Sequence, residues 1–289
     1  MNRKIKSRLK WSLLIFLFCW IVMAQSCMKF RISDSKAKEE FAQKGLQASF
    51  NYTDADETGL HYVKTGADTL PTIFFVHGSP GSWDAFKIYL MDTALLQHFR
   101  LISVDRPGFG YSSFGTAFNL EEQSLLINQV IQKENNQKPV HLVGHSIGGP
   151  VIVHLAQNHP EEFASLTILA GSISPYEEPK EYWRYLFMYT PLKILMPGAF
   201  KPSNDEIIYF KKDLYHTDTM YAALTMSVTF IHGDADKFVP VKNVEYGKKK
   251  LAGNPNVKVI IIPGASHFIP WEHFDLIKTH LLTLSGKNN

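Results

Sequence analysis

Hydrophobic residues in this chain gather in short continuous runs, and strict alternation with polar residues is uncommon. Six runs rich in β-branched residues are found at 71–78, 100–108, 139–146, 165–172, 227–234 and 258–266. Continuous runs of this length are typical of strands that are buried on both faces of a parallel sheet. Before them, "SFNYTD" and "GLHYVKTG" predict an opening pair of strands joined by a turn near Asp54–Thr58.

Helical patterns occupy the segments between most of these runs. We expect helices at 83–98, 120–134, 147–158, 242–252 and 271–285. Asn119 stands directly before the second of them, where its side chain can cap the helix. Strands that alternate with helices predict an α/β fold, with an open, mostly parallel central sheet flanked by helices on both faces.

One long insertion interrupts this alternation. About 55 residues separate the strand that ends near Gly171 from the strand that starts near Ser227, and connections of this length are uncommon unless functional. The insertion, at about 172–226, has helical patches and many large apolar side chains, which are Tyr176, Trp183, Tyr185, Phe187, Met188, Tyr189, Leu192, Leu195, Met196 and Phe200. It predicts a short helical lid over one end of the sheet, with its apolar side facing a pocket. A peripheral helical hairpin without substrate contact is the alternative.

The first 26 residues have the pattern of a targeting segment. Five cations and no acid precede or flank an apolar run at 11–24, and these are Arg3, Lys4, Lys6, Arg8 and Lys10. The run has the length of a signal-peptide core and is shorter than the roughly 20 apolar residues of a membrane span. Because a basic flank stays in the cytoplasm, we expect the rest of the chain to be exported and membrane-associated on the non-cytoplasmic side. A buried core helix is disfavoured, since no charge interrupts the run.

The only two cysteines are Cys19, inside the apolar run, and Cys27, just after it. "MAQSC" is similar to a bacterial lipoprotein cleavage site, although Gln25 departs from the usual pattern. Cleavage would make Cys27 the first mature residue and a site of lipidation; without cleavage the segment is a membrane anchor and Cys27 an ordinary thiol. We therefore divide the chain into a signal peptide or anchor (1–27), a stalk or first helix (28–47) and the main domain (48–289). That domain has no cysteine pair for a disulfide or a multi-cysteine metal site.

Composition excludes one class of partner. The chain has 289 residues, 45% hydrophobic and 20% charged, as expected for one α/β domain with a sizeable core. Its formal net charge of +3 comes from the basic N-terminal segment. Since the remainder is nearly neutral, we expect no nucleic-acid partner.

Candidate chemistry begins at Gly144-His145-Ser146-Ile147-Gly148, which follows an apolar run and precedes a predicted helix. A serine between strand and helix, flanked by glycines that allow a tight turn, is the context of a nucleophile elbow. A glycine-rich turn that contains a serine by chance is the alternative. Ser146 is the candidate nucleophile.

A serine nucleophile needs a base and an acid to orient it. His267 lies on the loop after the last predicted strand, and "FIHGDADKFVP" presents Asp236 and Asp234 after the strand before it. We select Asp236 and keep Asp234 as the alternative. The order Ser, Asp, His along the chain, at strand ends, fits one catalytic triad. The backbone N–H groups of Ser79, in the turn after 71–78, and of Ile147 are candidates for the oxyanion hole.

These segments together resemble the α/β-hydrolase superfamily. "HGSPGS", "DRPGFGYS", "GHSIGG", "HGDADKFVP" and "PGASHF" occur in the matching order from about residue 48 to 285. The resemblance implies an α/β-hydrolase fold, a Ser146–His267–Asp236 triad and an oxyanion hole at the amides of Ser79 and Ile147. It implies a structural turn for Asp105 and Arg106, and we interpret His77 and His145 as mainly structural.

The resemblance also narrows the activity. Haloalkane dehalogenases and epoxide hydrolases use an aspartate where this chain has Ser146, and proline iminopeptidases usually carry "HGGPG" in place of "HGSPG". We therefore expect a serine esterase or lipase-like hydrolase that acts on a small-molecule acyl substrate, apolar to judge from the predicted lid, without metal or organic cofactor. A C–C hydrolase, an aminopeptidase, a cofactor-free haloperoxidase and a non-catalytic binding domain of the same fold are the alternatives.

Overall fold

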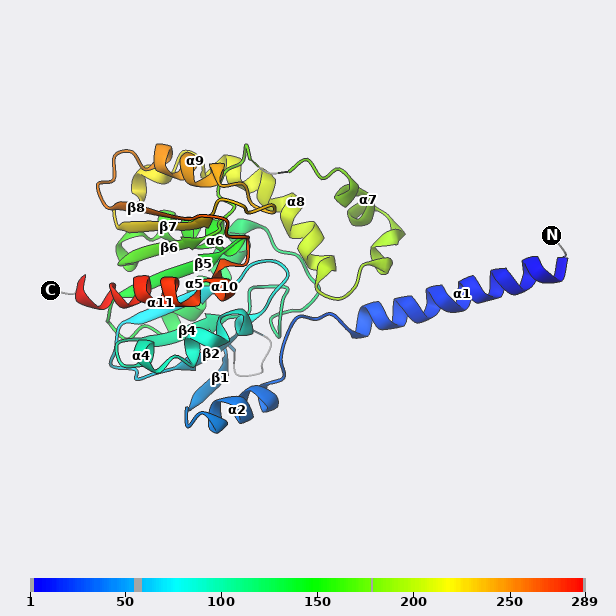
Figure 1. Ribbon diagram of the computed structural model, residues 1–289, viewed down its shortest axis with the longest axis horizontal. Helices are drawn as coiled ribbons and strands as arrows, with labels where there is room; N and C mark the ends of the chain where they lie inside the picture. Colours follow the sequence, from blue (N-terminus) through cyan, green and yellow to red (C-terminus); the bar gives the residue numbers. More distant parts are fainter. Residues whose placement is uncertain (1–2, 55–58, 178, 288–289) are drawn as a thin grey trace.

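An eight-stranded sheet forms the centre of the computed structural model, which describes residues 3–54, 59–177 and 179–287 (Figure 1). The strands lie in the order β1-β2-β4-β3-β5-β6-β7-β8. Their bounds are β1 Ala48–Tyr52, β2 His61–Thr65, β3 Thr72–Val76, β4 Arg100–Val104, β5 Val140–His145, β6 Ser165–Leu169, β7 Ser227–Gly233 and β8 Val257–Ile262. The pairs β1–β2 and β2–β4 are antiparallel and all the others parallel, which confirms the mostly parallel sheet. The turn predicted near Asp54–Thr58 includes residues 55–58, outside the described residues.

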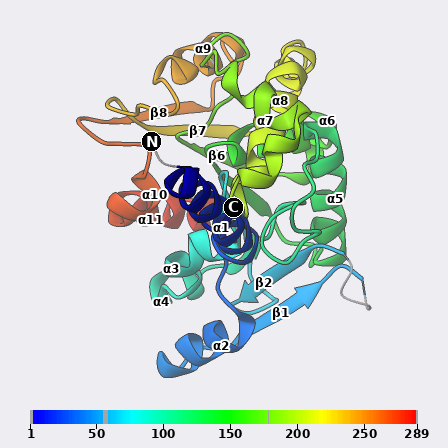
Figure 2. The same ribbon diagram turned by 90° about the vertical axis from the view of Figure 1, so that its right-hand side faces the viewer.

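Helices cover both faces of the sheet, and each face has its own buried apolar cluster (Figure 2). On one face pack α5 Leu120–Lys133, α6 Gly148–Asn158 and α9 Lys242–Lys250. On the other pack α2 Asp34–Gln43, the 3₁₀ helix η1 Trp83–Phe86, α3 Lys87–Leu90, α4 Thr93–Leu96, α10 Ile269–Glu272 and α11 Phe274–Leu282. Two further 3₁₀ turns are η2 Pro160–Glu162 and η5 Ser285–Lys287. This two-faced cover leaves the strand ends open, where the loops with the candidate residues lie.

Two predicted helices are broken, and capping explains the first break. The prediction of one helix over 83–98 is wrong, because the Asp92 side chain accepts a hydrogen bond from the Leu95 amide at 2.9 Å and starts a new helix there. The helix predicted at 271–285 is interrupted at His273, between α10 and α11. The Asn119 cap is confirmed, since its side chain and that of Glu122 form a reciprocal capping box.

The N-terminal segment contains two helices with different surroundings. Helix α1, Arg3–Ser26, projects away from the sheet (Figure 1), and its stretch Lys4–Ser26 is long and apolar enough to cross a membrane. Helix α2 packs against the sheet through the buried side chains of Ala37 and Phe41.

The insertion holds α7 Trp183–Tyr189, η3 Pro191–Leu195, α8 Phe200–Thr217 and η4 Tyr221–Ala223. Helix α8 is attached to the core through buried Phe210 and Leu214. Helix α7 has no buried residue, and Trp183 and Tyr189 are exposed. Of the aromatic residues predicted to face a pocket from this segment, Tyr176, Trp183, Tyr185 and Tyr189 are exposed, and Phe187 and Phe200 are half-buried.

Candidate active site

Ser146 occupies the sharp turn between strand β5 and helix α6. Its φ is 55°, in the left-handed region that residues with a side chain rarely adopt. The Ser146 amide donates to the Leu169 carbonyl at 3.0 Å, and the Gly149 amide donates to the Ser146 carbonyl at 2.9 Å. These bonds hold a strained serine at the carboxyl end of a central strand, where open α/β sheets bind their ligands.

The glycines beside Ser146 make this turn possible. A Cβ atom on Gly144 would lie 2.3 Å from the Gly148 carbonyl oxygen, and one on Gly148 would lie 2.2 Å from the Val76 carbonyl oxygen. Strands β3 and β5 and helix α6 therefore approach one another backbone to backbone, which only glycine permits. The strand–turn–helix context predicted for Ser146 is present.

His267 and Asp236 form a direct pair. The distance from His267 Nδ1 to Asp236 Oδ2 is 2.6 Å, and Asp236 Oδ1 accepts from the amides of Phe238 and Val239, both at 2.8 Å. Burial tends to raise the pKa of Asp236, but the bond with His267 and the backbone bonds outweigh it and lower that pKa. Because an ionised Asp236 holds Nδ1, Nε2 of His267 is the nitrogen that can exchange a proton.

The two acids left open by the sequence have different partners. Asp234 is exposed, and its Oδ1 accepts from the Gly264 amide at 2.6 Å. Asp236 has a fully buried side chain and also lies 3.5 Å from Nε2 of His232, a neighbour that sequence reasoning missed. The geometry therefore brings Asp236, and not Asp234, to His267.

His145 joins the loop of His267 to the serine turn. Its Nε2 lies 3.1 Å from the His267 carbonyl oxygen, and the two imidazole rings are 4.8 Å apart between centroids. Burial, followed by the nearby His267, lowers the pKa of His145 to about 3, so the ring is neutral at pH 7. A Cβ atom on Gly78 would lie 3.0 Å from both His145 Nδ1 and Ser146 Cβ. The turn after β3, the serine turn and the His267 loop thus meet at one place.

The two candidate oxyanion donors belong to segments that meet there. Ser79 follows Gly78 in the turn after β3, and Ile147 precedes α6, whose first N–H groups have no partner within the helix. The Ser79 hydroxyl is buried and has no hydrogen-bond partner within the described residues 3–54, 59–177 and 179–287. Its amide and hydroxyl can both serve a ligand.

Arg106 is buried behind this turn and fixes its backbone. Its Nε donates to the His77 carbonyl at 2.8 Å and its Nη2 to the Gly78 carbonyl at 3.0 Å. The Gly78 carbonyl and the Ser79 N–H belong to one peptide unit, which is planar. His77 Nδ1 also donates to the Gly78 carbonyl, at 2.6 Å. The two hydrogen bonds, from Arg106 and from His77, together set the direction of the Ser79 N–H group.

A carboxylate from the insertion holds Arg106. Glu206 on α8 accepts from Nη1 and Nη2 of Arg106 at 2.7 and 3.0 Å, and both side chains are fully buried. Gln123 on α5 completes the set, accepting from Arg106 at 2.7 Å and donating to Glu206 at 3.0 Å. Sequence reasoning found Arg106 as part of a turn and missed both partners.

Apolar side chains from two loops and from helix α10 lie near the candidate base. Phe238 and Phe268 lie 5.5 and 6.0 Å from the His267 ring, and Trp271 lies 5.3 Å from the His145 ring, between centroids. All three are exposed at the surface. Sequence reasoning missed them in favour of the insertion, although each stands within four residues of the candidate acid or base.

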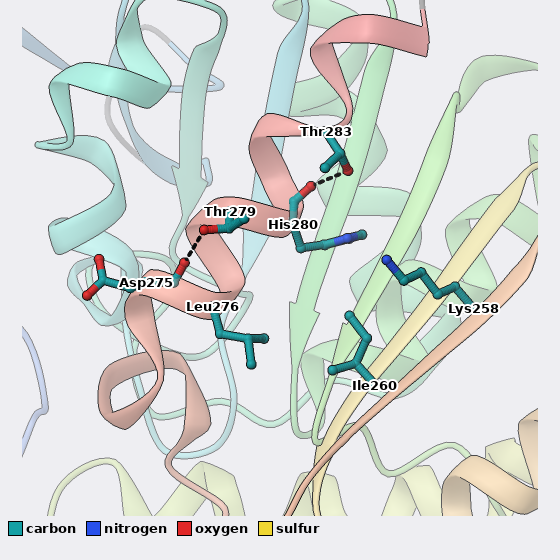
Figure 3. Close-up of a pocket in the computed structure, with 7 residues that line it drawn as sticks. All are labelled: Lys258, Ile260, Asp275, Leu276, Thr279, His280 and Thr283. Carbon is teal, nitrogen blue, oxygen red and sulfur yellow. Dashed lines mark hydrogen bonds between the residues drawn. The ribbon is translucent and has the colours of Figure 1, made fainter.

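A groove of about 420 Å³ lies elsewhere, between β8 and α11 (Figure 3). Its lining residues are Lys258, Ile260, Asp275, Leu276, Thr279, His280 and Thr283. It borders the amino-terminal half of β8, whereas His267 follows the carboxyl end of that strand. The groove is therefore separate from the candidate site.

One group of side chains has the spacing of metal ligands. His159, Glu161 and Glu162 offer ligand atoms within 4.8 Å of one another. They follow the C-terminal end of α6, whose N-terminal end follows Ser146. The group thus lies at the opposite end of that helix and has no part in the candidate site.

Comparisons with known proteins bear on the fold and the reaction class. A family model described as "alpha/beta hydrolase fold" matches residues 71–204. A bifunctional esterase/perhydrolase of Acinetobacter calcoaceticus is 25% identical over 278 residues, covering 80% of this chain and 97% of the relative. A 2-hydroxy-6-oxononadienedioate/2-hydroxy-6-oxononatrienedioate hydrolase of a Pseudomonas species is 22% identical over 270 residues, covering 81% and 94%.

Solved structures share the architecture. A putative lipase of Acinetobacter baumannii AYE aligns with a TM-score of 0.67 and 18% identity over 89% of this chain and 98% of that one. A membrane phospholipase A, described as a bacterial virulence factor, aligns with a TM-score of 0.61 and 16% identity over 98% of both chains. These likenesses confirm the predicted fold class.

Proposed function

Because the chain belongs to the α/β-hydrolase superfamily, we propose that it is a serine hydrolase that cleaves a carboxylic ester or related acyl bond. The observation that carries the proposal is the His267–Asp236 pair at 2.6 Å, on a loop that contacts His145, the residue before a serine held at a positive φ between strand and helix. Esterases, lipases and C–C hydrolases are among the relatives and structural neighbours. The residue types Ser146, His267 and Asp236 are those that acyl transfer requires, which supports the proposal.

In the proposed mechanism, Ser146 Oγ attacks the carbonyl carbon while His267 Nε2 takes the hydroxyl proton. The His267 proton then passes to the leaving alkoxide, and an acyl-enzyme remains on Ser146. A water molecule, deprotonated by His267, releases the acid and restores the serine. Asp236 keeps the imidazole oriented and stabilises its positive form, because its own pKa is lowered.

Two backbone amides stabilise the tetrahedral intermediate in this proposal. The N–H groups of Ser79 and Ile147 bind the negatively charged carbonyl oxygen. The bond from Arg106 to the Gly78 carbonyl supports this role for Ser79, since it fixes the shared peptide plane before substrate arrives. No metal or organic cofactor takes part in these steps.

We propose a small-molecule substrate with an apolar acyl or aryl group. Phe238, Phe268 and Trp271 form the apolar surroundings of His267 that support this choice. The second candidate reaction is C–C bond hydrolysis, which the relative from Pseudomonas favours by its name and its 94% coverage.

We also propose that the protein is exported and held at the membrane on the non-cytoplasmic side. The length and apolar composition of α1 support this, as does the alignment with the membrane phospholipase A over 98% of this chain. Cys27 is exposed at the end of α1 and is a candidate for lipidation if the segment is cleaved.

Labelling with a fluorophosphonate probe tests the proposal, because the probe reacts covalently with activated serines. We expect the wild-type protein to be labelled and the Ser146→Ala variant to be unlabelled. Ser49→Ala, an exposed serine on β1, is the matched control and should label like the wild type. Equal labelling of the Ser146→Ala variant would reject Ser146 as the nucleophile. A separate assay of the wild-type protein, with a panel of short acyl esters and a vinylogous diketone, distinguishes ester hydrolysis from C–C bond hydrolysis.

A further inference from the structure

The last two turns of helix α1 are hydrogen-bonded to the insertion. Trp20 Nε1 donates to the Leu195 carbonyl at 3.0 Å, Gln25 Nε2 to the Ile194 carbonyl at 3.0 Å, and the Gly198 amide to the Ala24 carbonyl at 2.7 Å. These partners are about 170 residues apart in sequence, so the contact is a feature of the tertiary structure. Figures 1 and 2 both show α1 and the insertion on the same side of the molecule.

The backbone of the insertion is shaped for this contact. Gly198 has a φ of +43°, and a Cβ atom there would lie 2.4 Å from the Met28 carbonyl oxygen and 2.5 Å from that of Cys27. The Ala199 amide donates to the Met28 carbonyl at 3.0 Å, and Ala24 is buried. These contacts tie α1 to the folded domain, which favours a helix that stays in the mature protein over a leader that is removed.

Beside α1, the insertion exposes an apolar surface that we call the lid face. Its exposed side chains are Tyr182, Trp183, Tyr185, Leu186, Tyr189, Leu192 and Ile194. The two cations within this stretch are paired, Arg184 with Glu181 and Lys193 with Asp205. Tryptophan and tyrosine are enriched where proteins meet the headgroup region of a bilayer, and paired charges lower the cost of lying there.

The length of the apolar run in α1 places this face close to lipid. Residues 11–24 span about 21 Å as a helix, whereas the hydrocarbon core of a bilayer is about 30 Å thick. A short span draws its flanking segments towards the bilayer. Because the insertion is bonded to residues 20–25, its apolar side chains lie at the end of that short span.

We propose that α1 is retained in the mature protein and holds the lid face in the headgroup region of the outer leaflet of a lipid bilayer. This inference rests on the membrane location proposed above and does not depend on the hydrolase chemistry. Because a retained α1 anchors the protein by itself, membrane attachment does not require a lipid on Cys27.

An environment-sensitive fluorophore tests the lid face in the full chain. In a Cys19→Ser/Cys27→Ser background, a nitrobenzoxadiazole dye is attached to Leu186→Cys. The control is Leu125→Cys, at an exposed position of α5. The protein is reconstituted in phosphatidylcholine vesicles that contain doxyl-labelled lipid. We expect a blue shift and severalfold stronger quenching by doxyl lipid at 186 than at 125, and weaker quenching by aqueous iodide.

Three outcomes would overturn the proposal. Equal iodide quenching of the dye at 186 and at 125 would show that the lid face is exposed to water. Protection from iodide without doxyl quenching would show that protein, such as a second copy of this chain, covers it. A native N-terminus at Cys27, seen by mass analysis of the wild-type chain, would show that α1 is removed. None of these measurements uses enzymatic activity, so an inactive protein would count only against the proposed reaction.

Discussion

At the scale of single residues, the buried Arg106–Glu206 pair ties the insertion to the proposed oxyanion donor. Removal of one charge from such a pair leaves the other buried without compensation, at a cost of about 3–5 kcal/mol. We expect Glu206→Gln to lower the free energy of unfolding by this order. In addition, we expect kcat for an ester to fall about tenfold with little change in KM, because Arg106 loses the carboxylate that aims it at the Gly78 carbonyl and the Ser79 N–H is held less firmly.

The control for Glu206 is Glu134, which pairs with Lys64 and Arg100 at the far edge of the sheet. Glu134→Gln should reduce stability in urea unfolding without changing kcat. An unchanged kcat in Glu206→Gln, measured where both variants are folded, would assign Glu206 to stability alone.

The pair Asp236 and Asp234 gives a second residue-scale prediction. Asp236→Asn should lower kcat about 10³–10⁴-fold, since the amide no longer stabilises the imidazolium or selects its tautomer. Asp234→Asn should change kcat less than severalfold, because Asp234 bonds to the Gly264 amide and His267 bonds to Asp236. Steady-state kinetics of ester hydrolysis by both variants tests this prediction. A larger loss of kcat in Asp234→Asn than in Asp236→Asn would contradict the proposed triad.

Sequence patterns at this scale predicted residue types better than partners. Ser146, His267 and an acid in 233–239 follow from their places at strand ends. The choice between Asp234 and Asp236 depends on the direction in which one loop turns, which no local pattern encodes. Glu206 lies 100 residues from Arg106 in a helix whose polar positions resemble those of any surface helix.

At the scale of elements, the close approach of β3 and α6 depends on Gly148. Gly148→Ala places a methyl group against the Val76 backbone, and we expect a loss of about 1–3 kcal/mol or more, because backbone gives way less readily than a side chain. Gly253→Ala is the control, since a Cβ atom there has open space around it. Thermal unfolding of the two variants should differ by several degrees, and equal midpoints would refute the steric argument.

Docking of α2 depends on a buried histidine. His61 lies 2.8 Å from Asp105 and 3.4 Å from Asp34 of α2, and although burial opposes its charge, the two carboxylates raise its pKa to about 9. A raised pKa adds stability that is complete below the unfolded pKa of about 6.5 and is lost as pH rises through 9. We expect the unfolding free energy to fall by about 3 kcal/mol between pH 6 and 9.5.

Urea unfolding across this range measures the effect, with His61→Gln as the comparison. The variant should show a nearly flat profile between pH 6.5 and 9, because its side chain does not titrate. Buried His145, whose pKa is lowered, adds stability that is lost only at acid pH and does not oppose the trend. A wild-type profile as flat as that of the variant would mean that His61 is neutral.

At the scale of the whole molecule, the sheet was predictable and the outer surface of the insertion was not. Continuous apolar runs predict buried parallel strands, since both faces of such strands are covered. Tyr189 and Leu192 are also apolar, but apolar residue types indicate only that a side chain favours non-aqueous surroundings. They do not indicate what those surroundings are. A side chain that faces a pocket and one that faces lipid have the same pattern in the sequence. The direction in which each points can be determined only from the three-dimensional structure.

The contact between α1 and residues 194–198 also has a consequence for the order in which the chain is made. Trp20 leaves the ribosome 175 residues before Leu195, and strands β1 to β6 are synthesised between them. Helix α1 must therefore exist without its partner during most of translation, while the sheet assembles beside it. The insertion is made after these strands, so a protein that is already tethered docks this part of its fold against its own anchor.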